Sequence, residues 1–138
     1  ILDYFDEIFE HHFSSGEMLL GGNKPKSVAK LFRDQEIKLL KPILDYFRNN
    51  NKCRLIGPGD NVLRAPTVAF VPKNKSPSNV ASDLNGYNIM AGAGDFYAVR
   101  PLKALGIDPE EGVVRLSFVH YTSEDEVTKL INSLDKVL

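Results

Sequence analysis

The residue with the clearest potential for chemistry is Arg115, which lies in the middle of a run, 113–120, that is typical of a β-strand. Polar and apolar residues alternate along this run, so neighbouring side chains should point to opposite faces of a sheet. The pattern places Val114, Leu116 and Phe118 on one face and Val113, Arg115, Ser117 and Val119 on the other. The planar guanidinium group of an arginine can bind a carboxylate through two parallel hydrogen bonds. An ordinary solvated sheet face is the competing interpretation, and spacing alone favours it.

A second candidate is the glycine-rich segment 91–98, which follows a predicted strand and precedes a predicted short helix. A loop in this position can bind phosphate groups at the start of the helix. The segment departs from the dinucleotide-binding pattern, because Tyr97 stands where the third glycine would be. A flexible surface loop is therefore the competing interpretation of this segment.

The histidines and the cysteine offer weaker signals. His11 and His12 are adjacent in a predicted helix, so their side chains point about 100° apart, and His120 is distant in the sequence. Two metal ligands on one helix face would be four residues apart, so we expect solvated histidines and no metal site. Cys53 has no base near it in the sequence, which favours a half-buried structural thiol over a nucleophile.

The composition is that of a globular protein of one domain, residues 1–138. Hydrophobic residues make up 43% of the chain and charged residues 25%, and the net charge is −1. This charge balance predicts no binding to nucleic acid or to an anionic membrane. No apolar run approaches the roughly 20 residues that span a bilayer. The single cysteine cannot form an internal disulfide and fits a cytoplasmic protein.

The pattern along the chain predicts an α+β fold, in which helices cover one face of a small, mostly antiparallel sheet. Helices are expected over residues 1–13, 24–49, 77–84, 101–105 and 123–138, and strands over 54–56, 67–71, 87–90 and 113–120. Ser123 and Glu126 have the spacing of a capping box at the start of the last helix. Asn23 is expected to cap the second helix and Pro42 to kink it.

The chain opens inside a helical pattern without an initiator methionine or a capping residue. This favours the interpretation that the sequence is a piece of a longer protein. On that interpretation, residues 1–23 are a helix and a linker from the side of a missing large domain.

Several runs in the sequence resemble one known family. They are residues 64–70, 94–98, 112–121 and 124–126, together with the proline-containing helix segment 39–44. In this order they resemble the C-terminal small domain of class V aminotransferases, and within that family the cysteine desulfurase-like subgroup. The resemblance covers the chain from about Lys26 to Leu138.

The resemblance implies a fold-type I enzyme that depends on pyridoxal phosphate (PLP), acts on an amino acid and forms a homodimer. Its large domain would hold the cofactor through a lysine upstream of Ile1, so this chain would contain no catalytic residue and would be inactive alone. The resemblance also implies that Arg115 binds the substrate carboxylate. Asp95, Phe96 and Tyr97 would line the substrate entrance.

The sequence departs from the family pattern at two points. Lys24 and Lys26 lie at a helix start and lack the setting of the cofactor lysine. Tyr97 stands where desulfurases of the family carry a nucleophilic cysteine, and a tyrosine hydroxyl cannot accept sulfur as a thiolate does. The reaction therefore stays open among transamination, β-elimination and desulfuration. A stand-alone α+β regulatory module that binds a ligand or a partner is the alternative function.

Overall fold

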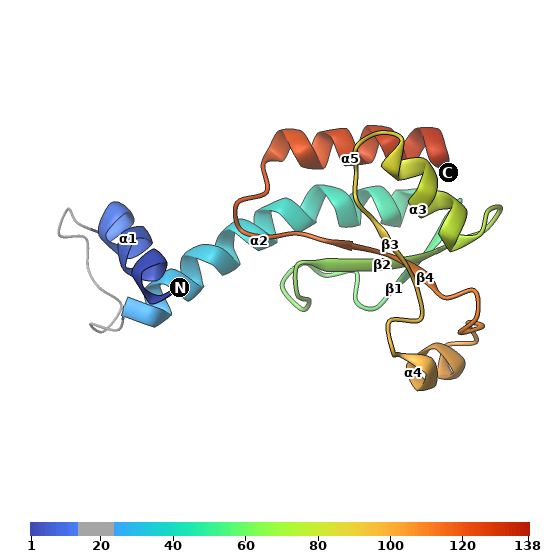
Figure 1. Ribbon diagram of the computed structural model, residues 1–138, viewed down its shortest axis with the longest axis horizontal. Coiled ribbons are helices and arrows are strands. Elements are labelled where there is room, and N and C mark those ends of the chain that lie inside the picture. The colour runs from blue at the N-terminus through green and yellow to red at the C-terminus, as the bar shows by residue number, and fades with distance from the viewer. Residues whose placement is uncertain (14–23) are drawn as a thin grey trace.

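The computed structural model describes residues 1–13 and 24–138, and it confirms the predicted α+β fold class (Figure 1). The elements are α1 (Leu2–Phe13), α2 (Lys24–Asn49), β1 (Cys53–Ile56), β2 (Thr67–Pro72), α3 (Pro77–Asn85), β3 (Gly92–Gly94), α4 (Val99–Ala104), β4 (Val113–Ser117) and α5 (Glu124–Val137). The linker predicted after the first helix and the predicted Asn23 cap lie outside the described residues.

The four strands form one sheet in the order β1-β2-β4-β3, and every neighbouring pair is antiparallel. The two central strands, β2 and β4, pair with Val68 opposite Leu116 and Phe70 opposite Val114. All four of these side chains are buried, so this register places the apolar positions of both strands on the same face.

The larger hydrophobic core lies on the face that α2, α3 and α5 cover (Figure 1). Its fully buried large side chains are Leu39, Leu40, Ile43, Leu44, Val68, Phe70, Val80, Leu84, Val114 and Leu134. Each such side chain stabilises the fold by about 1.5–3 kcal/mol relative to an exposed position. This burial holds β4 rigidly against the helices.

The opposite face of the sheet carries a smaller core under α4, which lies across the sheet from α5 in Figure 1. Leu102 and Ile107 pack there against Val113, the first residue of β4. Because α4 is only six residues long, it covers part of this face and leaves Arg115 exposed.

The prediction of a strand at residues 87–90 is wrong. The chain turns there, with Asn88 at a φ of 56°, and the third strand is Gly92–Gly94, inside the predicted loop. Gly92 pairs with Arg115 and Gly94 with Val113, so the strand exists through its pairing with β4 and not through its own propensity.

The long strand predicted over 113–120 ends earlier, at Ser117. The backbone N–H of Phe118 still donates to the carbonyl of Pro66, but the N–H of Val119 donates to the hydroxyl of Thr122. This side-chain hydrogen bond replaces the sheet ladder and turns the chain toward α5.

The predicted capping box at the start of α5 is confirmed. The N–H of Ser123 donates to Glu126 Oε2 over 2.8 Å, and the N–H of Glu126 donates to Ser123 Oγ over 3.2 Å. The carboxylate of Glu126 also accepts from the hydroxyl of Ser123, and the hydrogen bonds that it accepts from Ser123 favour its ionised form and lower the pKa of Glu126. Helix α2 runs through Pro42 as one element, and the kink predicted there stays a prediction.

Helix α1 lies away from the sheet, against the first half of α2 (Figure 1). Tyr4 Oη and His120 Nε2 are 2.6 Å apart, Lys24 Nζ donates to Asp6 Oδ1 over 2.7 Å, and Phe5 packs near Phe32. No residue of α1 is buried, so its docking depends on these few contacts. In the described part of the chain, no helix is both long and apolar enough to cross a membrane.

Candidate carboxylate-binding site

Arg115 lies on the open face of the sheet, at the middle of β4. Its neighbours across the ladder are Ala69 on β2 and Gly92 on β3, so the backbone at this position is fixed from both sides. Val114 and Leu116 point to the helix-covered core, and the alternation of the strand directs Arg115 to the opposite face. The face predicted for Arg115 is therefore confirmed.

The guanidinium group of Arg115 lies over the ring of Phe96, with Cζ 3.8 Å from the ring centroid. A cation in this position is attracted by the negative face of the aromatic ring. Within the described residues, no carboxylate forms an ion pair with Arg115. Its hydrogen-bond donors are thus available to an anion from outside the domain.

The loop after β3 turns sharply and separates its three predicted site residues. Phe96 and Tyr97 both have a left-handed backbone, with φ of 50° and 61°. Asp95 holds this turn, because its Oδ1 accepts from the N–H of Tyr97 and its carbonyl accepts from the N–H of Ala98. Residues other than glycine adopt this conformation rarely, and such strain is common where a site must be held in one geometry.

The structure therefore brings together two of the four predicted site residues, Arg115 and Phe96. Asp95 is engaged in its own turn, and the side chain of Tyr97 is fully exposed, with a relative accessibility of 102%. No described contact joins Tyr97 to Arg115, so its role at a substrate entrance stays a prediction.

Two hydroxyl groups on the sheet face of Arg115 form a pair that the sequence pattern did not predict. Thr67 on β2 pairs with Ser117 on β4, and their hydroxyl oxygens are 3.4 Å apart. The alternation of β4 already placed Ser117 beside Arg115, but the partnership with Thr67 depends on the register between two strands. The pair adds polar groups to the sheet face that carries Arg115.

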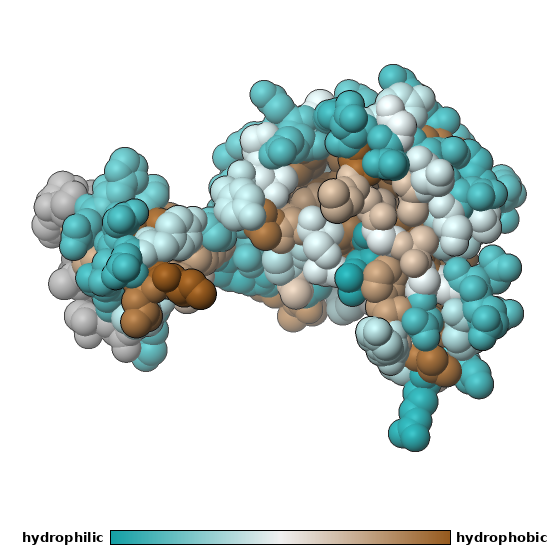
Figure 2. All heavy atoms as spheres, in the orientation of Figure 1, coloured by the Kyte–Doolittle hydropathy of each residue, from teal (hydrophilic) through white to brown (hydrophobic). Residues whose placement is uncertain are grey.

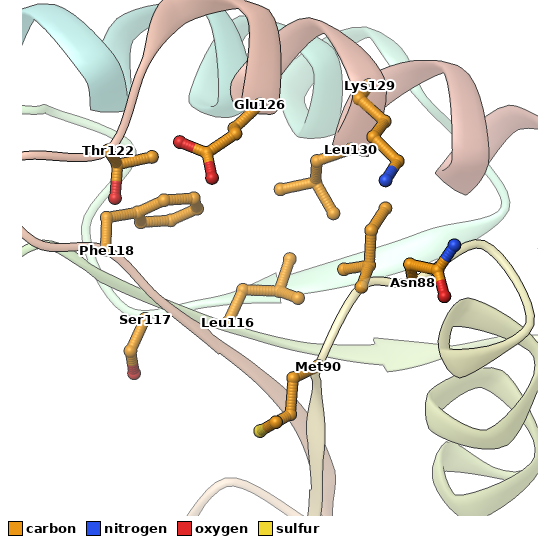
Figure 3. A pocket seen from close by; sticks show the side chains of 10 residues that line it. Asn88, Met90, Leu116, Ser117, Phe118, Thr122, Glu126, Lys129 and Leu130 are labelled. Atoms are coloured by element: carbon orange, nitrogen blue, oxygen red, sulfur yellow. The ribbon is translucent and has the colours of Figure 1, made fainter.

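A cavity of about 230 Å³ lies on the other side of β4, below α5 (Figure 3). In Figure 3, Leu116 and Phe118 point toward α5, whereas Ser117 points away from it. Arg115 does not line this cavity. Glu126, which does line it, is engaged in the cap of α5. The cavity is therefore separate from the Arg115 site.

Two further arginines hold the loop before β2 in place. Arg64 donates to the carbonyl of Thr67 through Nε and Nη2, over 3.2 and 2.9 Å. Arg33 on α2 donates to the carbonyls of Arg64 and Val62, over 2.8 and 2.6 Å. Burial lowers the pKa of Arg64. These hydrogen bonds fix the loop and leave neither guanidinium free for a ligand.

Cys53 lies on β1 and packs into the larger core, on the face of the sheet opposite to Arg115. Burial is the main reason that the pKa of its thiol is raised, and the charge of Lys73 offsets part of this rise. A protonated, buried thiol is a poor nucleophile. The predicted structural role of Cys53 agrees with this position.

The histidines are also placed by the structure. His11 and His12 form an edge-to-face pair on the exposed surface of α1, and His120 stacks on Phe32 with ring centroids 3.7 Å apart. Over residues 1–13 and 24–138, no three histidine, cysteine or acidic side chains are gathered as a metal site would require.

The described neighbours of Arg115 do not fit PLP itself. The cofactor is held as an imine by a lysine. The residues that pair with Arg115 or stack on it are Ala69, Gly92 and Phe96, and none of these is a lysine. Lys24, which lies at the start of α2, forms an ion pair with Asp6 of α1 and has no described contact with Arg115. The geometry suits a carboxylate and not the cofactor.

Comparison with known proteins adds a family to this geometry. Residues 28–130 match the family described as aminotransferase class-V. The aminotransferase-like protein FGM3 of Gibberella zeae is 29% identical over 121 residues, which cover 85% of this chain and 30% of that protein.

Solved structures are similar over the same part of the chain. The apo cysteine desulfurase of Thermococcus onnurineus NA1 has a TM-score of 0.73 at 27% identity, over 83% of this chain and 28% of that one. The cysteine desulfurase CsdA of Escherichia coli has a TM-score of 0.65 at 23% identity, over 76% of this chain and 25% of that one. At this lower identity, the similarity to the E. coli protein shows a shared fold alone. The chain thus spans less than a third of the length of each of these relatives.

Proposed function

The chain belongs to the aminotransferase class-V family, and on this premise we propose that it forms the substrate side of a PLP-dependent enzyme that acts on an amino acid. Arg115 binds the α-carboxylate of the substrate through its in-plane N–H groups. The observation that carries this proposal is the guanidinium group stacked on Phe96, on an open sheet face and with no described carboxylate as a partner. Asp95 and Tyr97 border the entrance to this site.

The work of Arg115 in the reaction is to orient the substrate. A carboxylate bound by two parallel hydrogen bonds cannot rotate freely, so the amino group of the substrate is presented in one direction. The cofactor, when bound to the protein, withdraws electrons from the substrate. No residue of this chain is assigned to hold PLP or to transfer a proton.

The rest of the enzyme is supplied from outside this chain. The chain covers 30% of its curated relative and 28% of a solved desulfurase. We infer that a large domain upstream of Ile1 carries the cofactor lysine, and that residues 1–138, a single small domain, are inactive without it. The enzyme would form a homodimer, as the family resemblance implies, and would act in the cytoplasm, which a single cysteine fits.

Helix α1 is the part of the chain that we expect the large domain to cover. Ile1 and Leu2 are 96% and 79% exposed, and Figure 2 shows hydrophobic atoms gathered on this lobe. Residues 1–23 would then belong to the side of the large domain. The exposure of these two neighbouring apolar side chains supports this assignment, because contact with the large domain would remove them from water.

The reaction stays open among transamination, β-elimination and desulfuration. A route through a persulfide on this chain is disfavoured, because Tyr97 stands at the position of the family's cysteine and Cys53 lies in the core behind the sheet. The family membership also favours an enzyme part over a stand-alone regulatory module.

The proposal is tested in the full-length, PLP-loaded protein by calorimetric binding of L-alanine and of ethylamine, which lacks the carboxylate. We expect the wild type to bind L-alanine more tightly, and Arg115→Gln to weaken this binding by about 10- to 100-fold, because hydrogen bonds to charged groups contribute about 1.5–3 kcal/mol. Binding of ethylamine should not change.

Arg48→Gln is the matched control, because Arg48 is an exposed arginine of α2 that pairs with Asp45. It should bind both compounds as the wild type does. A wild type without preference for L-alanine, or an Arg115→Gln variant that keeps the full preference, would contradict the proposed function.

A further inference from the structure

We propose that Phe96 is a positioning residue: its ring fixes the direction of the Arg115 guanidinium group and so sets the geometry of carboxylate binding. This inference rests on the proposed function of Arg115. Cζ of Arg115 lies 3.8 Å from the centroid of the Phe96 ring, and this is the contact that holds the end of an otherwise exposed side chain.

A guanidinium group that packs over an aromatic ring by its face leaves the edge of its plane free. The N–H groups of arginine lie in that plane and point outward from its edge. A ring under the face therefore limits the motion of the side chain without occupying its hydrogen-bond donors. A lysine at position 115 would have no planar group to pack against the ring.

Gly92 makes room for the end of the Phe96 ring. A Cβ atom added to Gly92 would lie 2.9 Å from Cζ and 3.0 Å from Cε1 of Phe96, closer than such atoms approach. Gly92 is also the ladder partner of Arg115 on β3. The ring thus lies close both to Gly92 on β3 and to the guanidinium group, and a side chain at position 92 would have to shift it.

The backbone of the loop after β3 adopts an uncommon conformation that places the Phe96 ring under the guanidinium group. Phe96 and Tyr97 are both left-handed, a conformation that residues with a Cβ adopt at a cost in free energy. The hydrogen bonds that Asp95 accepts from Tyr97 and Ala98 offset this cost. The loop therefore stabilises one placement of Phe96, which is the property a positioning residue needs.

The experiment uses the full-length protein and measures the rate at which phenylglyoxal modifies Arg115, followed by mass spectrometry of its peptide. The L-alanine concentration that halves this rate reports carboxylate binding at Arg115 itself. We expect Phe96→Leu to raise this concentration about two- to fivefold, the range for losing an exposed cation–π contact. Phe96→Tyr, which keeps the ring, should match the wild type.

Gly92→Ala provides a second, independent variant, because its methyl group must displace the ring while Phe96 and Arg115 both remain. We expect it to raise the protecting concentration as Phe96→Leu does. Tyr87→Leu is the matched control, since it removes another cation–π contact, to Lys136 at 5.2 Å, and should leave protection unchanged. Thermal unfolding of each variant identifies a loss of folding.

The outcomes separate the two proposals. If the same L-alanine concentration halves the modification of Arg115 in the wild type and in folded Phe96→Leu, the positioning role is overturned and the proposed function stands. A Phe96→Tyr variant as weak as Phe96→Leu also overturns it, because the ring would then not be what matters. Failure of L-alanine to protect the wild type overturns the proposed function, and the positioning role with it.

Discussion

At the scale of single residues, three arginines of this chain use the same group for different tasks. Arg33 and Arg64 donate to backbone carbonyls and hold the loop before β2. Arg115 instead lies on an aromatic ring, with no described carboxylate as its ion-pair partner. The residue type alone does not distinguish these tasks, because each follows from the groups that surround the guanidinium. A guanidinium whose donors are already used cannot serve as a substrate clamp.

Cys53 provides a prediction at the same scale. Its side chain is 6% exposed and burial raises its pKa, so in the native protein both access and the thiolate fraction are low. We expect Ellman's reagent to react with Cys53 at least about 100-fold more slowly in the native protein than in denaturant, because reaction requires local opening. The native rate should rise with pH, and its midpoint should lie above that of an ordinary thiol.

The measurement is the absorbance of the released thiolate dye, over time and at several pH values. Cys53→Ala, which has no thiol, sets the background. Native and unfolded rates within a few-fold of one another would contradict the buried position and would make a sulfur-accepting role for Cys53 worth testing.

At the scale of elements, the approach of β4 to β3 depends on a glycine. Gly112 precedes β4 with a φ of 69°, and an added Cβ would lie 2.3 Å from the backbone carbon of Gly94. A backbone atom cannot move aside as the end of a side chain can. An alanine here would therefore separate the edge strand from β4.

Gly106 offers a matched comparison, since its φ of 70° is similar but an added Cβ would meet nothing within 4 Å. We expect Gly106→Ala to lower the free energy of unfolding by about 1–2 kcal/mol, the cost of left-handed backbone in a residue with a Cβ. Gly112→Ala should lower it by clearly more, because the clash adds to the same strain. Urea unfolding of the two variants checks this difference, and equal losses would contradict it.

The elements also show where sequence patterns are informative. The capping box of Ser123 and Glu126 and the alternation along 113–117 were predicted correctly, because both depend on neighbours a few residues apart. The strand predicted at 87–90 was wrong, because apolar residues there suggested a strand that the chain does not pair. Strand β3 lies in a glycine-rich segment with low strand propensity, and pairing with β4 overrides that propensity.

At the scale of the whole molecule, the chain consists of a well-packed α+β layer and a loosely attached helix. The core joins α2, α3 and α5 to the sheet, whereas α1 packs on α2 and buries no residue. Such a helix has little apolar burial to oppose local opening. The two parts should therefore differ in stability.

Hydrogen exchange tests this difference. We expect the amides of α1 to exchange much faster than those of the buried second half of α2, residues 39–47, and of α5. The measurement is exchange followed by mass spectrometry of peptides, first on this chain and then on the full-length protein. Protection of α1 that appears only in the full-length protein would support a large domain covering it. Equal protection of α1 and residues 39–47 in the isolated chain would contradict the expected difference.

The sequence by itself determined the features that local interactions govern. These include the helix periods, the cap at Ser123, the buried face of the strand at 113–117 and the exposure of Arg115 on its opposite face. The order of motifs along the chain also indicated the family, which the match over residues 28–130 confirms. Each of these signals lies within a stretch of a few residues or in the order of such stretches.

Only the tertiary structure decided what surrounds Arg115. The ring of Phe96, the space left by Gly92 and the hydroxyl pair of Thr67 and Ser117 come from three strands and a loop. Their meeting depends on strand register and on two left-handed residues in one turn, which are set by pairing and packing between segments distant in the sequence. Local propensity depends only on residues that are near in the sequence, so it does not encode these contacts. This is the physical reason why they could not be predicted.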